Sequence, residues 1–273
     1  MNSTYKPECG YYKQYLLLYL DFLGAKSRIM HDDSPLNPWV SSLNTVLSHI
    51  PSYQRYRNEE DPSSERPYVK VFSDNVAVVF EVPQTENDLK EKLVYLIDFA
   101  GLFQTMSLGD NGWLIRGCLT SGYLYINKHN PPANRSKNSL DEIDFFIGPA
   151  LIRADKIEKE LAFYPRIIVD TTNVDFGGTQ IRLCDEIIQL WNNPSWLLKS
   201  DDGLYYLDYL SLSIPGMDKH TKTDFLGELS IGMDKLDDEY EYGELDEKAR
   251  AKIDWTRSYV DNTLEKYKTL GKL

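Results

Sequence analysis

Apolar and polar positions form two kinds of pattern along this chain, short continuous apolar runs and apolar residues spaced three or four apart. One continuous run, residues 14–20, stops at Asp21 and predicts a buried central strand. Two further runs flank Ser73-Asp74-Asn75 and predict a hairpin with a tight turn. The predicted strand regions are 14–20, 68–82, 113–126 and 165–170.

Helical spacing of apolar residues separates these strands. A cap-like Thr85 begins one of the predicted helices, and Pro149 suits the first turn of another. The predicted helices cover 39–50, 85–109, 148–161, 181–191 and 247–270. Charged or proline-bearing stretches predict an exposed loop at 55–67, a polar loop at 127–141 and an acidic, solvated linker at 233–247. Residues 204–212 fit either a strand or an ordered loop.

The order strand, helix, hairpin, helix, strand, helix, strand indicates an α+β fold. Such an order predicts a ferredoxin-like palm sheet with helices on one face. We expect this domain to span residues 1–175. Residues 176–273 then form a largely helical C-terminal extension that packs on the same domain or on a dimer partner.

Composition narrows the classes of function. The 273 residues include 42 acidic and 30 basic side chains, a formal charge of -12. This balance argues against nucleic acid or an anionic membrane as a partner, because both require a positive surface. Three cysteines and four histidines are scattered without disulfide or zinc spacing. The first residues lack a signal-like pattern, so we expect a cytoplasmic protein without an anchor.

Asp21 and Asp74 are the candidate functional centre. On the predicted topology the first strand and the hairpin are neighbours, so the two carboxylates converge at one sheet edge. Close carboxylates repel unless a cation lies between them, and hard oxygen ligands suit Mg²⁺ or Mn²⁺. The alternative is that Asp21 caps a helix and Asp74 merely forms a turn. Their joint occurrence in this strand order favours the metal site.

Four segments in the right order resemble class III nucleotide cyclases. YLDFLGAK at 19–26 resembles the F-x-D-I-x-G-F element, and KVFSDNVAVVF at 70–80 resembles the K-x-x-G-D hairpin. LIRGCLTSGYLY at 114–125 is similar to the R-x-G-x-x-x-G strand. FFIGPALIRADKIEKE at 145–160 looks like the W-G-x-x-V-N-x-A-x-R-x-E helix, matching at Gly148, Ala154 and Glu158. The resemblance covers residues 12–170 and is closest to divergent bacterial members, including antiphage pyrimidine cyclases.

The resemblance implies a nucleotidyl cyclase palm with two Mg²⁺ or Mn²⁺ ions on Asp21 and Asp74. It implies a homodimer with shared clefts, acting on a nucleoside triphosphate. The implied nucleotide contacts are the backbone of Phe22, Leu23, Gly24 and Ala25 for the phosphates, with Lys70 and Phe145 at the base. Lys156 or Arg153 is implied as the residue that stabilises the transition state.

The chain departs from the family at several of these positions. Ile152 stands where the family has its transition-state asparagine, and Lys156 where it has arginine, whose bidentate fork lysine lacks. Phe145 stands at the position of the purine-reading aspartate, which makes a pyrimidine at least as plausible as adenine. Ser73 replaces the glycine before Asp74.

Two further residues have open roles. Lys70 either contacts the base or is a strand-edge lysine that extends to solvent. Arg116 is either a partner for a buried acid or a phosphate ligand.

The sequence therefore predicts a nucleotidyl cyclase that forms a 3′,5′-cyclic nucleotide and pyrophosphate, and the resemblance to antiphage members implies a role in antiphage signalling. One alternative is a catalytically inactive cyclase-like module that binds a nucleotide or a protein. Another is a palm-type polymerase or oligonucleotide cyclase, which shares the sheet and the paired acids.

Overall fold

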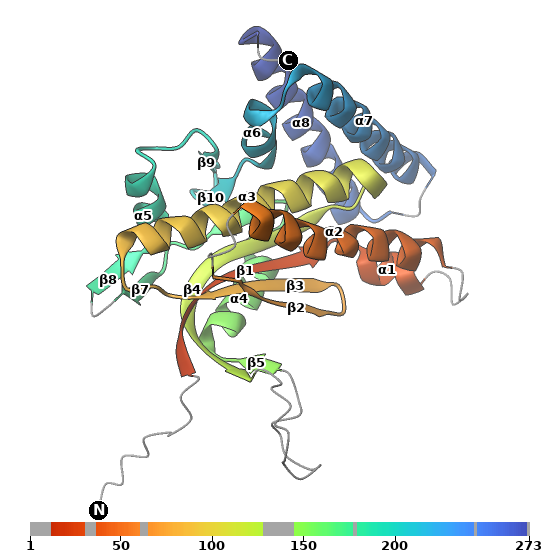
Figure 1. Ribbon diagram of the computed structural model, residues 1–273. Coiled ribbons are helices and arrows are strands. Elements are labelled where there is room, and N and C mark those ends of the chain that lie inside the picture. The colour runs from red at the N-terminus through yellow and green to blue at the C-terminus, as the bar shows by residue number, and fades with distance from the viewer. Residues whose placement is uncertain are drawn as a thin grey trace, which may run out of the picture.

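The protein is built around one mixed β-sheet flanked by helices (Figure 1). The structure is a computed structural model that describes residues 12–30, 37–60, 65–127, 145–176, 179–242 and 245–271. The described strands are β1 (Tyr12–Phe22), β2 (Tyr68–Phe72), β3 (Asn75–Glu81), β4 (Ile115–Asn127), β5 (Phe145–Ile147), β6 (Ile167–Val169), β7 (Asn173–Phe176), β8 (Thr179–Arg182), β9 (Leu197–Lys199) and β10 (Tyr205–Leu207). The predicted 127–141 loop falls largely outside the described residues.

The strand order is β2-β3-β1-β4-β6-β10-β9, with β5 paired to the end of β4, and β7 and β8 form a separate small sheet. Within the run β2-β3-β1-β4 every neighbouring pair is antiparallel. This order and pairing are the ferredoxin-like arrangement predicted from the sequence. Beyond them β6 is parallel to β4, and β10 and β9 continue antiparallel. Residues 197–207, part of the predicted extension, therefore continue the main sheet.

Helices cover both faces of this sheet. The described helices are α1 (Ala25–Met30), α2 (Pro38–Glu60), α3 (Glu86–Asn111), α4 (Pro149–Glu160), α5 (Leu183–Leu190), α6 (Tyr209–Ser213), α7 (Lys219–Tyr242) and α8 (Glu247–Thr269). In Figure 1, α2 and α3 lie above the sheet and α4 lies below it.

The α+β class is confirmed, but the expectation of helices on one face only is corrected. Leu16, Leu18 and Leu20 of β1 belong to the core under α2 and α3. Leu17 and Tyr19 belong to the core under α4. Successive residues of a strand point to opposite faces, so a continuous apolar run has two faces to bury.

Two predicted loops are helical. The stretch at 55–67 begins inside α2, which extends to Glu60 despite Pro51. The acidic stretch at 233–247 begins inside α7, which ends at Tyr242. Leu229 and Leu236 of α7 are buried in a core with Leu108 of α3, so one apolar face supports the helix while the acidic face stays in solvent.

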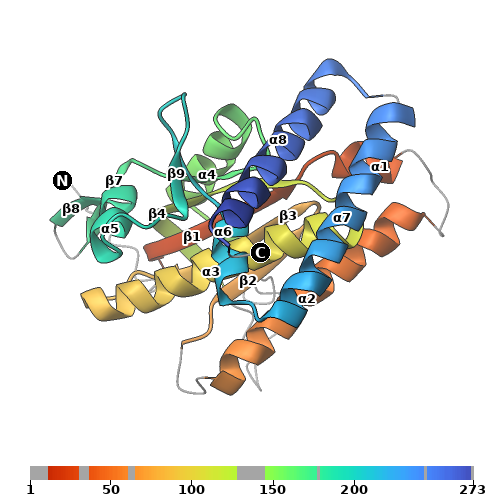
Figure 2. The same cartoon turned by 90° about the horizontal axis from the view of Figure 1, so that it is seen from above.

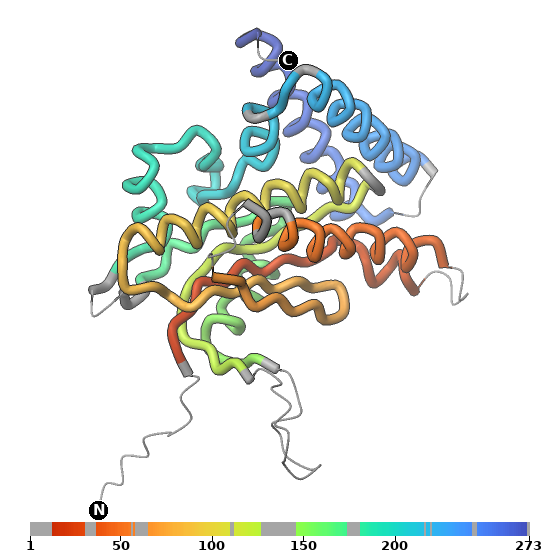
Figure 3. The backbone as a smooth tube through the Cα atoms, in the orientation of Figure 1, coloured from red at the N-terminus to blue at the C-terminus, as the bar shows by residue number. Residues whose placement is uncertain are grey.

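The C-terminal helices α7 and α8 form a pair beside α3 and above the N-terminal part of the chain (Figures 1 and 2). Tyr259 and Val260 of α8 are buried, and the ring of Trp255 stacks on that of Tyr259 at 5.3 Å. Ile253 of α8 shares a buried core with Leu23 and Leu114, more than a hundred residues earlier in the chain, whose course can be followed by colour in Figure 3. In the described part of the chain, no helix is long and apolar enough to span a bilayer.

Candidate metal and nucleotide site

The structure brings Asp21 and Asp74 to the same edge of the sheet. Asp21 is the penultimate residue of β1 and pairs in register with Asn75, the first residue of β3. The backbone N–H of Phe22 donates to the carbonyl oxygen of Asp74 at 3.1 Å. Two positions separated by 52 residues of sequence are therefore neighbours, as the hairpin topology requires.

The turn that carries Asp74 is tight. Phe72 pairs with Asn75, which leaves Ser73 and Asp74 as the two-residue loop. Ser73 has φ of 55°, in the left-handed region that favours glycine. A serine adopts this backbone conformation at a cost of about 1 kcal/mol.

Asp21 lies in a cluster of buried charge with Arg116 and Glu158. The Nε of Arg116 donates to Oδ2 of Asp21 at 3.0 Å, and its Nη2 forms an ion pair with Glu158. The Glu158 side chain is 2% exposed. Burial, followed by the nearby Asp21 carboxylate, raises the pKa of Glu158 to about 7, against the opposing effect of Arg116. Of the two roles open to Arg116, the structure supports that of partner to buried acids.

Glu158 is a site residue that the sequence assignment left out. Its position four residues after Ala154, on the buried face of α4, was the available signal. An acid at this spacing falls on the buried face of the helix, and buried acids are paired or hold cations. The spacing therefore predicted a partner for Glu158 within the fold.

The donors present fit one or two divalent ions. Magnesium commonly takes one or two protein carboxylates and completes its shell with phosphate oxygens and water. Asp21 uses one oxygen on Arg116, and Asp74 accepts from the Asn75 side chain at Oδ1, 3.1 Å away. Asp74 thus keeps a second oxygen, whereas the Asp21 carboxylate also lies within hydrogen-bond reach of Glu158. Within the described residues there is no ready-made group of three or more His, Cys, Asp or Glu side chains arranged for a metal. The protein therefore has room for substrate oxygens in the metal shell.

Fewer backbone N–H groups are available to hold phosphate than the sequence predicted. Phe22 N–H is used on Asp74, and Leu23 N–H donates to Leu114 O at 2.8 Å. In the described part of the chain, Gly24 and Ala25 have no such backbone acceptor. Gly24 has φ of 77° and open space where a Cβ would stand. Of the four predicted positions, Gly24 is exposed and keeps its backbone N–H for a ligand, whereas Ala25 is only 1% exposed.

Lys70 lies on the same face of the sheet as Asp21. It pairs with Ala77, in the core under α4, and stands between Tyr68 and Phe72 on β2. The ring of Phe146 contacts both of these rings, at centroid distances of 6.2 and 5.8 Å. The backbone of Phe145 belongs to β5, and its side chain lies outside the described part of the chain. Phe146 was not among the residues predicted from the sequence, and its ring covers this face of the sheet.

Arg153 and Lys156 are not brought to the aspartates within one chain. Arg153 donates to Ser121 O at 2.9 Å, and Ser121 pairs with Leu16. Leu16 is five residues before Asp21, so the two levels are about 17 Å apart along the strand. Lys156 is 68% exposed and pairs with Glu160 at 3.8 Å. Both side chains line a separate surface cavity of about 560 Å³.

A second unpredicted feature is a cavity of about 360 Å³ between the turn after β1 and the C-terminal helices, here called the hairpin cavity. Its lining residues are Leu23, Gly24, Ser27, Arg28, Leu114, Leu236, Glu239, Leu245, Asp246, Lys248, Ala249, Lys252 and Ile253. Burial, and after it the Arg116 guanidinium, lowers the pKa of Lys252, while Asp246, Asp21 and Glu158, in that order, oppose the shift. Lys252 is therefore within electrostatic reach of Asp21.

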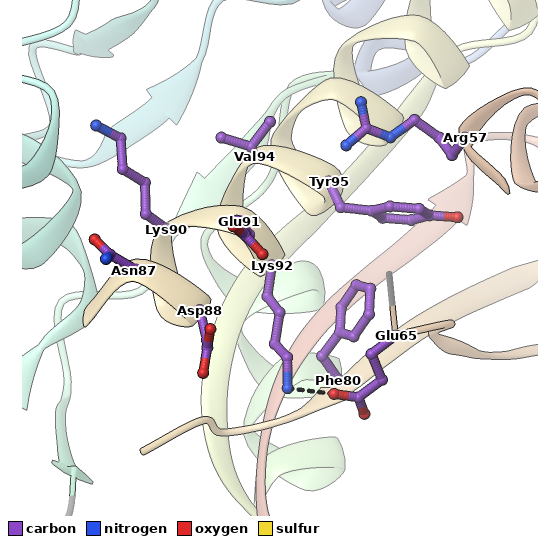
Figure 4. Close-up of a pocket in the computed structure, with 10 residues that line it drawn as sticks. All are labelled: Arg57, Glu65, Phe80, Asn87, Asp88, Lys90, Glu91, Lys92, Val94 and Tyr95. Atoms are coloured by element: carbon purple, nitrogen blue, oxygen red, sulfur yellow. Dashed lines mark ion pairs between the residues drawn. The ribbon is translucent and has the colours of Figure 1, made fainter. Parts of the chain in front are cut away.

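Another cavity, of about 710 Å³, lies at the start of α3. Figure 4 shows Lys92 reaching Glu65 there, an ion pair of 2.6 Å. Its charged lining balances three cations, Arg57, Lys90 and Lys92, against three anions, Glu65, Asp88 and Glu91. No charge is left over for a ligand, so this cavity is not a candidate for the phosphate site.

Comparison with known proteins gives structural likenesses only. No protein-family model matches the chain, and no curated protein matches it either. A monomeric guanylyl cyclase domain of the RhoGC fusion protein from the aquatic fungus Blastocladiella emersonii is 14% identical, with 72% of this chain and 95% of that chain covered and a TM-score of 0.41. The guanylate cyclase domain of RhGC from Catenaria anguillulae, in complex with GTP, is 14% identical over 71% and 94%, with a TM-score of 0.38. The adenylyl cyclase CyaB from P. aeruginosa is 13% identical over 71% and 93%, with a TM-score of 0.40. Values this low do not define a family for the chain.

Proposed function

We propose that this protein is a metal-dependent nucleotidyl cyclase that converts a nucleoside triphosphate to a 3′,5′-cyclic nucleotide and pyrophosphate. The observation that carries the proposal is the pairing of Asp21 with Asn75, which sets the Asp21 and Asp74 positions side by side at a sheet edge. The turn at Gly24 and Ala25, with N–H groups not used in the described backbone, follows directly.

In this reaction the ribose 3′-oxygen forms a bond to the α-phosphorus, and the bond from that phosphorus to the bridging oxygen of pyrophosphate breaks. Asp21 and Asp74 would hold Mg²⁺ or Mn²⁺, which when bound lowers the pKa of the 3′-hydroxyl and neutralises phosphate charge. Arg116 holds the Asp21 carboxylate in place through its Nε. Gly24 and Ala25 orient the outer phosphates.

The cation for the α-phosphate comes from Arg153 or Lys156 of a second copy. Within one chain these side chains lie away from Asp21, which supports a homodimer with shared clefts. Arg153 is the stronger candidate of the two, because its guanidinium is already positioned on the Ser121 carbonyl.

The base proposed is a pyrimidine, and the biological role proposed is antiphage signalling. The support for the base is Phe145, which stands where the resemblance places an acid that reads purines. The support for the role is the resemblance alone. A neighbouring gene for an effector with a cyclic-nucleotide-binding domain is the expected genomic context.

Product analysis tests the activity. The full chain is incubated with ATP, GTP, CTP and UTP in turn, with Mn²⁺, and products are identified by mass spectrometry. We expect one cyclic mononucleotide and equimolar pyrophosphate, reduced at least about tenfold in Asp21→Asn and in Asp74→Asn. The matched control is Asp201→Asn, an exposed turn residue in the Asp201-Asp202-Gly203 turn. A linear or oligomeric phosphodiester product would identify a polymerase or oligonucleotide cyclase instead.

A cyclase-like nucleotide-binding module without turnover is the second candidate. It is favoured by Ile152, which is 69% exposed and stands where the resembled cyclases have asparagine. An isoleucine side chain has no group that can hydrogen-bond a phosphate. Metal-dependent binding of a nucleotide with no product from any of the four would establish it.

A further inference from the structure

Lys252 is a half-buried cation that the fold leaves without an acidic partner. It lies on α8, and its ammonium group stands 5.6 Å from the centre of the Phe163 ring. Within the described residues, no carboxylate lies within ion-pair distance of it. Taking a charge partly out of water without a counter-ion costs free energy, and an anion at this point offsets that cost.

The acidic groups of the hairpin cavity are already committed to protein partners. Glu239 forms an ion pair with Arg28, which also stacks on the Trp39 and Trp113 rings. Asp246 caps α8 by accepting from the N–H of Ala249 at 2.7 Å.

The basic groups of the cavity are not committed in this way. Lys248 lies one helical turn before Lys252 and lines the same cavity, and the described residues offer it no ion pair either. The lining therefore holds three basic side chains, Arg28, Lys248 and Lys252, against two acids, Glu239 and Asp246, an excess of one positive charge.

The position of the cavity connects these lysines to the proposed nucleotide site. The turn after β1 also lines the cavity, through Gly24 and Ser27. The same β1 carries Asp21 at its end, and Lys252 feels the Asp21 charge. The volume of about 360 Å³ is at the lower end for a small-molecule site, which suits a di- or triphosphate group better than a whole nucleotide.

We infer that the hairpin cavity receives the β- and γ-phosphates of the substrate, and that Lys252 from α8 of the same chain is their cationic ligand. The inference rests on the proposed function and adds to it a residue from the C-terminal extension. The extension then has a direct part in the site: α8 supplies in cis a charge that the turn after β1 lacks. Lys248 adds a second, more exposed charge at the cavity entrance.

Calorimetric binding separates Lys252 from the rest of the site. Inorganic triphosphate and each of the four nucleoside triphosphates are titrated with Mg²⁺ into the full chain, and into Lys252→Met, which keeps the length of the side chain without its charge. The control is Lys268→Met, the same change at an exposed position of the same helix. We expect the Kd for triphosphate and nucleotide to rise at least about tenfold in Lys252→Met and to stay within about twofold in Lys268→Met.

The outcomes distinguish a failure of the inference from a failure of the proposed function. Unchanged affinity in Lys252→Met, with binding lost in Asp21→Asn, overturns the inference and leaves the proposed function standing. Absence of binding by the unmodified chain overturns both. Hydrogen exchange on the unmodified chain gives a second measurement that needs no variant. Triphosphate is expected to protect residues 23–28 and 246–253, and protection confined to other segments overturns the inference.

Discussion

Arg116 connects the two acids whose positions define the site. It contacts Asp21 through Nε and Glu158 through Nη2, and all three side chains are less than one fifth exposed. A buried cation between two acids is costly to remove, because its removal leaves like charges facing each other in a poorly solvated place. The residue thus contributes both to stability and to the geometry of Asp21.

Replacing this arginine gives the first prediction at the residue scale. Arg116→Met is expected to lower the free energy of unfolding by about 3 kcal/mol at pH 8, measured by urea denaturation. Adding Glu158→Gln is expected to recover part of the loss, because it removes one of the two uncompensated carboxylates. Arg257→Met is the control, since Arg257 pairs with Asp237 and Asp254 near the surface and its loss is expected to cost less than about 1 kcal/mol. Equal losses in both arginine variants would contradict the proposed role of the cluster.

At the scale of elements, the β9–β10 hairpin is fastened to the sheet by a charge pair. Arg166, 4% exposed, forms an ion pair with Asp202 in the connecting turn and donates to Ser200 at 2.7 Å. Desolvation alone would raise the pKa of Asp202, but hydrogen bonds from Arg166, Ser200 and Leu204 lower it to about 2. The turn therefore has a structural role in holding the hairpin to the sheet.

This pair predicts a defined pH dependence. The folded-state pKa of Asp202 is below its unfolded value, so its stabilisation is present above about pH 4 and is lost as the pH falls toward 2. Asp202→Asn is expected to cost about 1 kcal/mol at pH 7, a modest value because the Asp202 side chain is nearly half exposed. The difference between variant and unmodified chain, followed by urea denaturation, should shrink steadily below pH 4. A difference that stays constant to pH 2 would show that the charge of Asp202 is not what stabilises the hairpin.

At the scale of the whole molecule, the aspartates and the basic residues of α4 lie on different parts of one chain. A homodimer in which each cleft takes Asp21 and Asp74 from one copy and Arg153 from the other places them together. Such a dimer has two equivalent clefts, each built from both chains. A defect in one half can then be compensated by an intact half on the partner.

Mixing variants tests this arrangement. Asp74→Asn and Arg153→Ala are each expected to be nearly inactive, and an equimolar mixture, unfolded and refolded together, is expected to recover about a quarter of the unmodified activity. Half of the dimers would be mixed, with one intact cleft each. The control is a mixture of Asp74→Asn with Asp21→Asn, which affects the same half of the cleft and should restore nothing. Recovery in both mixtures, or in neither, would argue against shared clefts.

The local elements followed from the sequence because their signals are local. An apolar run that ends in Asp21 and a turn that contains Asp74 identify a strand end and a hairpin, and alternation of helix and strand then gives the ferredoxin-like order. Helical spacing located α8 to within a residue at each end. The loop predictions at 55–60 and 233–242 were wrong, because both segments are helical. Their many charged residues suggested solvent exposure, and the apolar face of each helix became recognisable only from its packing in the structure.

The sequence by itself determined which residues end the strands and form the turn, and therefore that Asp21 and Asp74 are neighbours. Tertiary structure alone decided what surrounds them. Glu158 and Arg116 meet because α4 packs on β1 and β4. Lys252 and Gly24 line one cavity because α8 packs back on a turn more than 200 residues earlier in the chain. Strand pairing follows from a period-two pattern and a short turn, whereas contacts between distant helices depend on how whole faces pack, which no local pattern encodes.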